Sequence, residues 1–238
     1  MKSLRLFGIT LYMGSAVLTA HADTFGSIGY NYQNQDLKLD GGGKIKANLQ
    51  GVAIDIFEQE QGSSIYGDLV GRFLVADGDV EGNIGDSSRE RLWSGEYRIG
   101  ARLTPMLGLY AGIGYQNWRS KIDVGEDTNE ITRKQWYSPI GIDLLGQLSG
   151  AGGWRLFAEY GVLWSGKNKI ETADSMTEPD QDSGHYYQVG AQAWYRFSRD
   201  MQLEIGPYYR RWDVDKADHD ALPGYKVNSY GIIVSLAY

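Results

Sequence analysis

The sequence contains no cysteine and, among its 238 residues, only 3 histidines and 5 prolines. Without cysteine there is no disulfide framework, no thiol nucleophile and no cysteine-ligated metal. The few histidines show no spacing typical of a metal centre, so we expect neither a metal nor a cofactor. Stability must therefore come from burial of side chains and from pairing of backbone hydrogen-bonding groups.

A long hydrophobic run is also missing from most of the chain. No segment after residue 22 offers the roughly 20 apolar residues that a membrane-spanning helix needs. The apolar stretch from Leu6 to Leu18 follows Lys2 and Arg5 and precedes Ala-His-Ala at 20–22, a pattern that signal peptidase cleaves. We predict a cleaved signal peptide over residues 1–22. An uncleaved anchor is the alternative, but the run is short for about 30 Å of hydrocarbon.

Basic charge is in short supply in the remaining part, residues 23–238. Two of the 23 Lys and Arg residues fall in the signal peptide, so 21 basic residues face 30 acidic ones, a net charge of 21 − 30 = −9. An acidic chain without a concentrated basic patch argues against nucleic acid as a partner. Aromatic residues and glycine are abundant instead, with 17 Tyr, 7 Trp and 32 Gly. Such a composition suits strands in which every second residue is apolar.

Alternation with a period of two dominates the sequence. In residues 93–103 the apolar Trp, Tyr and Ile alternate with Ser, Glu and Arg, and the same pattern recurs in 154–164 and 187–197. Ten strands are predicted on this basis: 24–34, 47–57, 64–76, 91–103, 106–118, 135–148, 154–165, 185–197, 201–212 and 226–238.

The connections between these strands alternate in length. Five are long and polar (35–46, 77–90, 119–134, 166–184, 213–225), and four are short (58–63, 104–105, 149–153, 198–200). Long outer loops and short periplasmic turns are typical of outer-membrane barrels. We therefore predict an all-β fold: an antiparallel, up-and-down transmembrane β-barrel of ten strands, with eight strands as the alternative. Both termini would lie in the periplasm, and five loops would lie outside the cell.

The polar face of these strands carries carboxylates and arginines but no lysine. A soluble sandwich or a lipocalin-like barrel would also show alternation. Arginine without lysine, however, favours paired and partly desolvated ions over an open surface, because the guanidinium binds carboxylates with two nitrogens. We expect an ion network in the lumen formed by Glu96, Arg98, Arg102, Arg155, Glu159, Arg196, Glu204 and Arg210. Asp55, Asp68, Arg72 and Asp143 share this face.

The chain ends in Ile232, Val234, Leu236 and Tyr238, which alternate up to a terminal aromatic residue. This ending resembles the C-terminal signal by which outer-membrane barrels are recognised for assembly, with Tyr238 as its last residue. The resemblance implies the barrel assembly machinery as a partner. It also implies a location in the outer membrane of a Gram-negative-type bacterium, in contact with membrane lipid and lipopolysaccharide.

Three segments, 109–116, 135–141 and 186–190, resemble strands of the omptin family, the ten-stranded outer-membrane proteases. Omptins use an Asp-x-Asp pair and an Asp-x-His pair to activate water for peptide hydrolysis. Asp77-Gly78-Asp79 stands where the resemblance places the first pair. The segment 171–176, where the second is expected, contains no histidine.

The weak catalytic candidates are therefore Asp77 and Asp79 with His185 or His219. The more ordinary interpretation is a polar loop-tip turn at residues 77–79 and a solvated loop residue at His219. Other activities have less support. Ser183 and His185 are too weak a pairing for a barrel lipase or lipid A deacylase. The acidic loops lack a twelve-residue calcium loop.

A narrow pore is the third possibility. Small barrels fill their lumen with side chains, and the inward face adds aromatic residues to the charges: Tyr66, Tyr110, Trp118, Phe157, Trp194, Tyr208 and Trp212. The sequence thus predicts a closed barrel that serves as a surface-binding, adhesin-like or envelope-structural protein with an unknown extracellular ligand. An omptin-like endopeptidase or another barrel hydrolase is the alternative.

Overall fold

The computed structural model describes residues 22–238 apart from Asn83, Asp174, Asp182 and residues 217–222. The predicted signal peptide, except for its last residue, and the candidate His219 lie outside the described residues. None of the described residues forms a helix long and apolar enough to cross a membrane.

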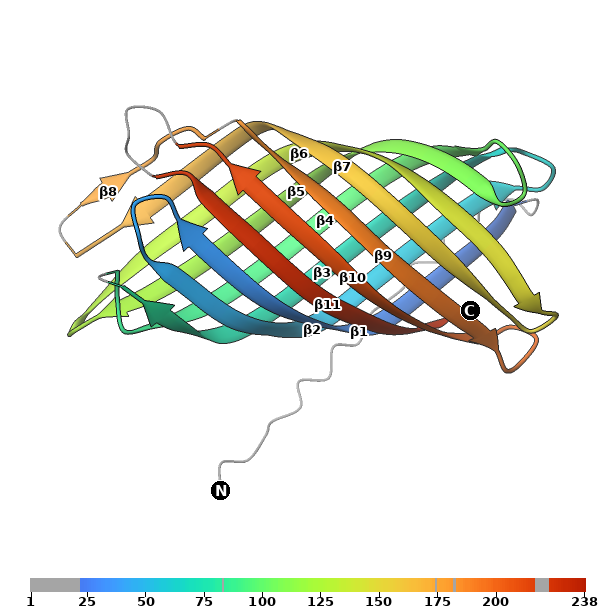
Figure 1. The fold of residues 1–238 in the computed structure, drawn as a ribbon, viewed down its shortest axis with the longest axis horizontal. Helices are drawn as coiled ribbons and strands as arrows, with labels where there is room; N and C mark the ends of the chain where they lie inside the picture. Colours follow the sequence, from blue (N-terminus) through green and yellow to red (C-terminus); the bar gives the residue numbers. More distant parts are fainter. Residues whose placement is uncertain (1–21, 83, 174, 182, 217–222) are drawn as a thin grey trace, which may run out of the picture.

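The described chain folds into one continuous antiparallel sheet (Figure 1). Its strands are β1 (Ala22–Leu39), β2 (Lys44–Glu60), β3 (Ile65–Glu81), β4 (Ser87–Arg102), β5 (Leu107–Val124), β6 (Asp127–Ser149), β7 (Gly152–Glu171), β8 (Met176–Thr177), β9 (Gly184–Arg196), β10 (Gln202–Val214) and β11 (Tyr225–Ala237).

Neighbours in sequence are neighbours in space, and the sheet closes where β1 pairs with β11. The short β8 pairs only with the end of β7, so ten strands form the wall. The predicted ten-stranded, up-and-down barrel is confirmed. We call the end that carries the turns 61–64, 103–106, 150–151 and 197–201 the short-turn end, and the opposite end the outer end.

The strands run further toward the outer end than the sequence pattern predicted. The expected long loop 119–134 is a β-hairpin, because β5 ends at Val124 and β6 begins at Asp127. Gly125 takes a φ of 61° in the tight turn between them, a conformation that glycine adopts without strain. The expected loop-tip turn at residues 77–79 is also wrong: Asp77 and Asp79 are paired residues within β3.

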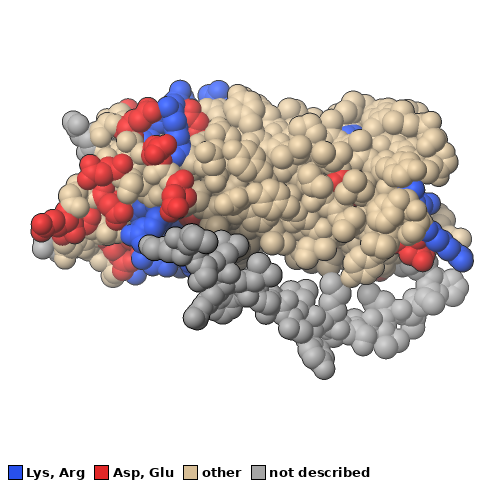
Figure 2. Space-filling model, turned by 90° about the horizontal axis from the view of Figure 1, so that it is seen from below, with Lys and Arg blue, Asp and Glu red and all other residues tan. Residues whose placement is uncertain are grey.

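The outer face of the wall is an apolar belt. On β4 the outward Trp93, Tyr97 and Ile99 are 43%, 48% and 55% exposed, whereas the inward Glu96 and Arg98 are 5% and 7% exposed. Figure 2 shows that charged side chains are sparse over the middle of the molecule and gather at the outer end. This distribution is the one that a membrane-spanning barrel needs.

A girdle of outward aromatic rings marks the outer edge of the belt. The rings of Trp93 and Tyr115 lie 5.0 Å apart, those of Tyr115 and Trp136 lie 4.8 Å apart, and those of Trp136 and Trp164 lie 6.2 Å apart. Tyr187, Tyr209 and Tyr230 continue the girdle on β9, β10 and β11. We call the described parts of the wall beyond these rings the outer collar: residues 36–46, 77–91, 117–134, 166–184 and 211–227.

The lumen changes character along its length. Inside the outer collar it is filled by buried apolar and aromatic side chains, which we call the outer core: Leu37, Ile45, Trp118, Ile122, Tyr137, Leu163, Tyr186, Trp212, Val214, Tyr225 and Val227. Below the outer core the inward side chains are charged and hydrogen-bonded. The outer core therefore blocks any water-filled path along the lumen at the outer end.

Inward tyrosines lie flat against glycines of the neighbouring strand. A Cβ atom at Gly161 would fall 1.9 Å from a ring carbon of Tyr186, and one at Gly141 would fall 2.3 Å from the ring of Tyr110. These pairs are directly opposite in the sheet register, Gly161 with Tyr186 and Gly141 with Tyr110. Only glycine leaves room for the ring, so these positions fix where each tyrosine hydroxyl points into the lumen.

Candidate functional site

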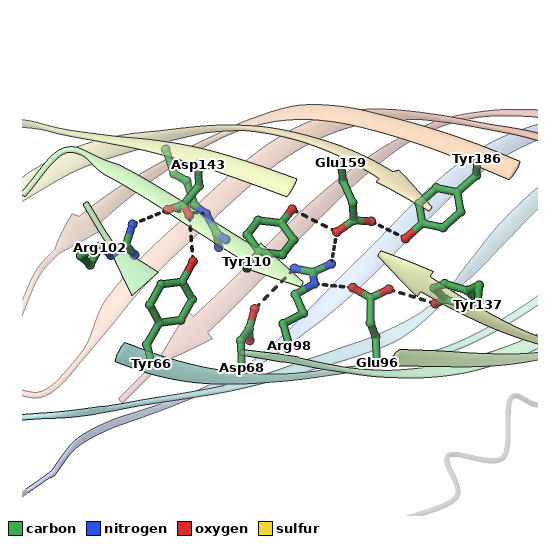
Figure 3. A network of polar contacts seen from close by, with 11 residues as sticks. Tyr66, Asp68, Glu96, Arg98, Arg102, Tyr110, Tyr137, Asp143, Glu159 and Tyr186 are labelled. Atoms are coloured by element: carbon green, nitrogen blue, oxygen red, sulfur yellow. Dashed lines mark hydrogen bonds and ion pairs between the residues drawn. The ribbon is translucent and has the colours of Figure 1, made fainter. Parts of the chain in front are cut away.

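The centre of the polar lumen is Arg98, which extends from β4 into a ring of carboxylates (Figure 3). Its guanidinium forms ion pairs with Glu96, with Asp68 at 3.4 Å and with Glu159 at 3.0 Å. Glu159 comes from β7, and only β5 and β6 lie between β7 and β4 in the wall, so this contact bridges the lumen between strands that are not neighbours. All four side chains are at least nine-tenths buried.

Tyrosine hydroxyls donate to the two glutamates of this group. Glu159 accepts hydrogen bonds from Tyr110 at 3.0 Å and from Tyr186 at 2.7 Å. Glu96 accepts one from Tyr137 at 3.0 Å. Because Tyr137 and Tyr186 also belong to the outer core, the same rings end the apolar region and begin the polar one.

Asp143 on β6 is the second centre, nearer the short-turn end. It accepts from Arg102 at 2.5 Å and from the hydroxyl of Tyr66 at 3.0 Å, while the nearest nitrogen of Arg155 lies 3.8 Å away. Asp143 is fully buried. A buried carboxylate of this kind requires a cation and hydrogen-bond donors at once.

The remaining members of the expected network lie elsewhere. Arg210 donates to Gln188 at 2.5 Å and lies over the ring of Tyr186. Glu204 accepts from Gln192 and Ser235 and forms no ion pair with a described residue. Arg196 does not join the network: it is the last residue of β9 and its side chain is exposed.

Those weak catalytic candidates that the structure describes are not brought together. Asp77 and Asp79 are exposed on the outward face of β3. His185 is exposed at the start of β9, where its ring stacks at 5.9 Å on Tyr160. Four strands separate β3 from β9 in either direction around the barrel, so these groups lie on opposite walls. Among the described residues, no cluster of acidic residues and His could hold a metal ion.

Tyr238 closes the ring at the short-turn end. Its backbone N–H donates to the carbonyl of Gly26 at 3.0 Å, and its carbonyl accepts from the N–H of Gly26 at 3.1 Å. The side chain is 58% exposed on the outside of the barrel. The terminal aromatic residue is therefore accessible at the edge of the apolar belt.

Comparisons with known proteins bear on the fold. No family model and no curated protein matches the chain. Among solved structures, the outer membrane protease OmpT from Escherichia coli has a TM-score of 0.61 at 12% identity, covering 94% of this chain and 99% of that one.

Two further solved structures are more distant. The translocator domain of the autotransporter NalP from Neisseria meningitidis has a TM-score of 0.49 at 10% identity, covering 90% of this chain and 88% of that one. The outer membrane protein AlkL has a TM-score of 0.48 at 10% identity, with 97% of each chain covered. Together with the apolar belt, the likeness to OmpT places this chain in the fold class of the small outer-membrane β-barrels.

Proposed function

We propose that the protein is an integral outer-membrane barrel that does not conduct and that acts from its outer collar, as a surface-binding or envelope-structural protein. The outer core carries this proposal. Leu37, Leu163 and Tyr186 are at most 2% exposed in the part of the lumen that would have to open for passage. Small barrels whose interior is filled in this way have no channel.

The outer collar has the stiffness that a binding platform needs. Lys46 pairs with Glu81 at 2.5 Å and Arg119 pairs with Glu130 at 2.5 Å, in both cases across adjacent strands on the outside of the wall. Single exposed pairs contribute little. They lie, however, on a continuous β-ladder with an apolar core inside, so the rim is held in one shape.

A row of basic residues lies directly beyond the aromatic girdle. Arg91 stands opposite Arg119 in the register of β4 and β5, and Lys134 stands opposite Lys167 in that of β6 and β7. Like charges directly opposite one another are unfavourable unless an anion lies near them. Glu130 supplies one for Arg119, whereas Arg91, Lys134 and Lys167 form no ion pair with a described residue. We propose that the phosphates of the outer-leaflet glycolipid, lipopolysaccharide, bind this row, with the rings of the girdle against its acyl chains.

Conductance in planar lipid bilayers tests the closed lumen. The protein folded into the bilayer is expected to show no channel steps, because the outer core leaves no aqueous path. Stable single-channel openings of the unmodified protein would overturn the proposal in favour of a pore.

Insertion into lipid vesicles tests the membrane assignment. Ala158 lies on the lipid face near the middle of β7, where arginine costs roughly 2–4 kcal/mol in a barrel. Ala158→Arg should reduce the folded fraction in vesicles, while Trp164→Arg in the girdle should be tolerated better. Equal effects of the two substitutions, or folding of the parent chain in buffer without any amphiphile, would contradict a membrane barrel.

An endopeptidase like OmpT is the second candidate, supported by the shared fold. The described residues oppose it, because His185 and the Asp77–Asp79 pair lie on different walls. Cleavage of a peptide library by the folded protein, abolished by Asp77→Asn, would favour this candidate over a binding role. No cleavage would leave the binding role.

A further inference from the structure

The short-turn half of the lumen is hollow, in contrast to the outer half. A central chamber of about 80 Å³ lies below Arg98 and is lined by Asp55, Arg72 and Tyr208, among others. A vestibule of about 280 Å³ lies between it and the short-turn end, with Phe57 and Trp194 in its wall.

The two spaces are contiguous. Asp55, Arg155, Gln192 and Glu204 line both of them. The vestibule residues Phe25, Phe57 and Arg102 stand at the short-turn ends of β1, β2 and β4. Because the outer core fills the opposite end, the described residues leave the chamber open toward the short-turn side alone.

Two guanidinium groups in the chamber lack a full set of partners. Arg72 forms no hydrogen bond or ion pair with a described residue; its guanidinium lies 5.3 Å from the ring centre of Tyr208, and its Nε is buried without an acceptor. The Nε of Arg155 is also buried without a hydrogen bond, 3.8 Å from an Asp143 carboxylate that Arg102 already holds. A buried cation without an acceptor is costly.

A carboxylate oxygen in the wall of the vestibule lacks a donor. Asp68 is 3% exposed, and its Oδ1 is buried without a hydrogen bond. Asp55 and Arg72 are diagonal neighbours, since Ala53 faces Arg72 and Asp55 faces Val70 in the register of β2 and β3. They nevertheless form no ion pair. The chamber wall thus carries a guanidinium and a carboxyl group close to each other, with no ion pair between them.

We propose that the chamber and the adjoining part of the vestibule together bind a small zwitterion, a molecule that carries an ammonium and a carboxylate a few bonds apart, as a free α-amino acid does. The ligand's carboxylate accepts from Arg72 and Arg155, and its ammonium donates to Asp55 and Asp68. Pockets for drug-sized ligands span about 300–1,000 Å³, so this space fits a smaller molecule. The site faces the periplasm and is independent of the collar's role.

Calorimetric titration of the full folded protein in detergent micelles tests the proposal. The probes are the free amino acids alanine, glutamate and lysine, with acetate and methylamine as single-charge controls. At least one amino acid is expected to bind, and at least tenfold more tightly than either control. Arg72→Gln and Asp55→Asn should each weaken that binding at least tenfold. Arg196→Gln, which changes an exposed arginine at the same end of the barrel, should not.

Three results would overturn the proposal. The first is that none of the three amino acids gives a heat of binding. The second is that acetate binds as tightly as the amino acids. The third is that Arg72→Gln and Asp55→Asn both bind the amino acid as tightly as the unmodified protein does. Heat-modified gel mobility confirms that each variant is folded. If Arg72→Gln fails to fold, Asp55→Asn alone decides, because it keeps the shape of the side chain and removes only its charge.

Discussion

The two halves of the lumen are built from the same strands but by opposite chemistry. On β7, Leu163 packs into the outer core, Glu159 joins the ring of carboxylates around Arg98, and Arg155 lines the chamber. All three point inward at intervals of four residues. The outer face of the same strand stays apolar from Leu156 to Trp164. The outward residues therefore determine that the strand lies in lipid, while the inward residues decide separately where the barrel is closed and where it is hollow.

The largest effect is expected where the polar half is most densely paired. Arg98→Met would leave Asp68, Glu96 and Glu159 buried without their shared cation, and removal of one partner from a buried ion pair costs about 3–5 kcal/mol. We expect the urea midpoint of unfolding from lipid vesicles to fall accordingly. Arg196→Met is the matched control and should change little. Similar midpoints for both variants would mean that water, not protein, solvates these carboxylates.

A smaller effect is expected from the apolar half. Leu37 is fully buried in the outer core, and a buried leucine replaced by alanine costs about 2–5 kcal/mol, part of it from the cavity that remains. Leu37→Ala should fall within this range but below the loss at Arg98, because it leaves no buried charge without a partner. Leu203→Ala on the lipid face should cost less, since acyl chains fill the gap. The same unfolding measurement checks both, and the reverse order would contradict an apolar seal.

The boundary between the halves can be tested at Gly161, against which the ring of Tyr186 lies. Gly161→Ala should lower the free energy of unfolding by about 1–3 kcal/mol, the usual cost of overpacking. It should also displace the Tyr186 hydroxyl, which donates a hydrogen bond to Glu159. Gly95→Ala is the control, because nothing lies within 4 Å of a Cβ atom at that position. An equal effect at both glycines would show that the backbone, and not the ring, sets the cost.

The smallest effect is expected from acidification, which should weaken the hydrogen bonds and ion pairs on the outward face of the outer collar. Hydrogen bonds from Thr128 and Ser87 lower the pKa of Asp123, and the hydrogen bond from Arg119 lowers the pKa of Glu130. A carboxylate with a lowered pKa stabilises the folded state above its ordinary pKa and loses that contribution as the pH falls through the lowered value. Hydrogen exchange in hairpin 119–134 should therefore accelerate only below about pH 4. Acceleration near pH 6 would point to another group.

The sequence pattern located the ten strands but not their full length, and the reason is visible on β5. Within the belt its apolar residues point outward. Beyond the girdle Trp118 and Ile122 point inward to the outer core, while Arg119 and Lys121 point outward. Water replaces lipid there, so the apolar face changes sides. A search for outward apolar residues stops at that point and assigns the rest of the strand to a loop.

Alternation also indicated which charged residues face the lumen, but not which of them meet. Arg98 and Glu159 come from β4 and β7, and their contact depends on the width of the barrel, which no local pattern contains. Arg196 has the inward spacing of its neighbours, yet its strand ends there and the side chain is exposed. The positions of the tyrosine hydroxyls that donate to these carboxylates depend in turn on glycines of adjacent strands, which leave room for the rings.

The seam between β1 and β11 gives the wall the topology of a ring. Gly26 and Tyr238 share two backbone hydrogen bonds, so the two ends of the barrel domain lie side by side at the short-turn end. A short peptide could join them, and the chain could then be opened at another short turn, such as the one near residues 150–151, without changing any strand pairing. The order in which the strands are synthesised could thus be changed while the finished barrel stays the same.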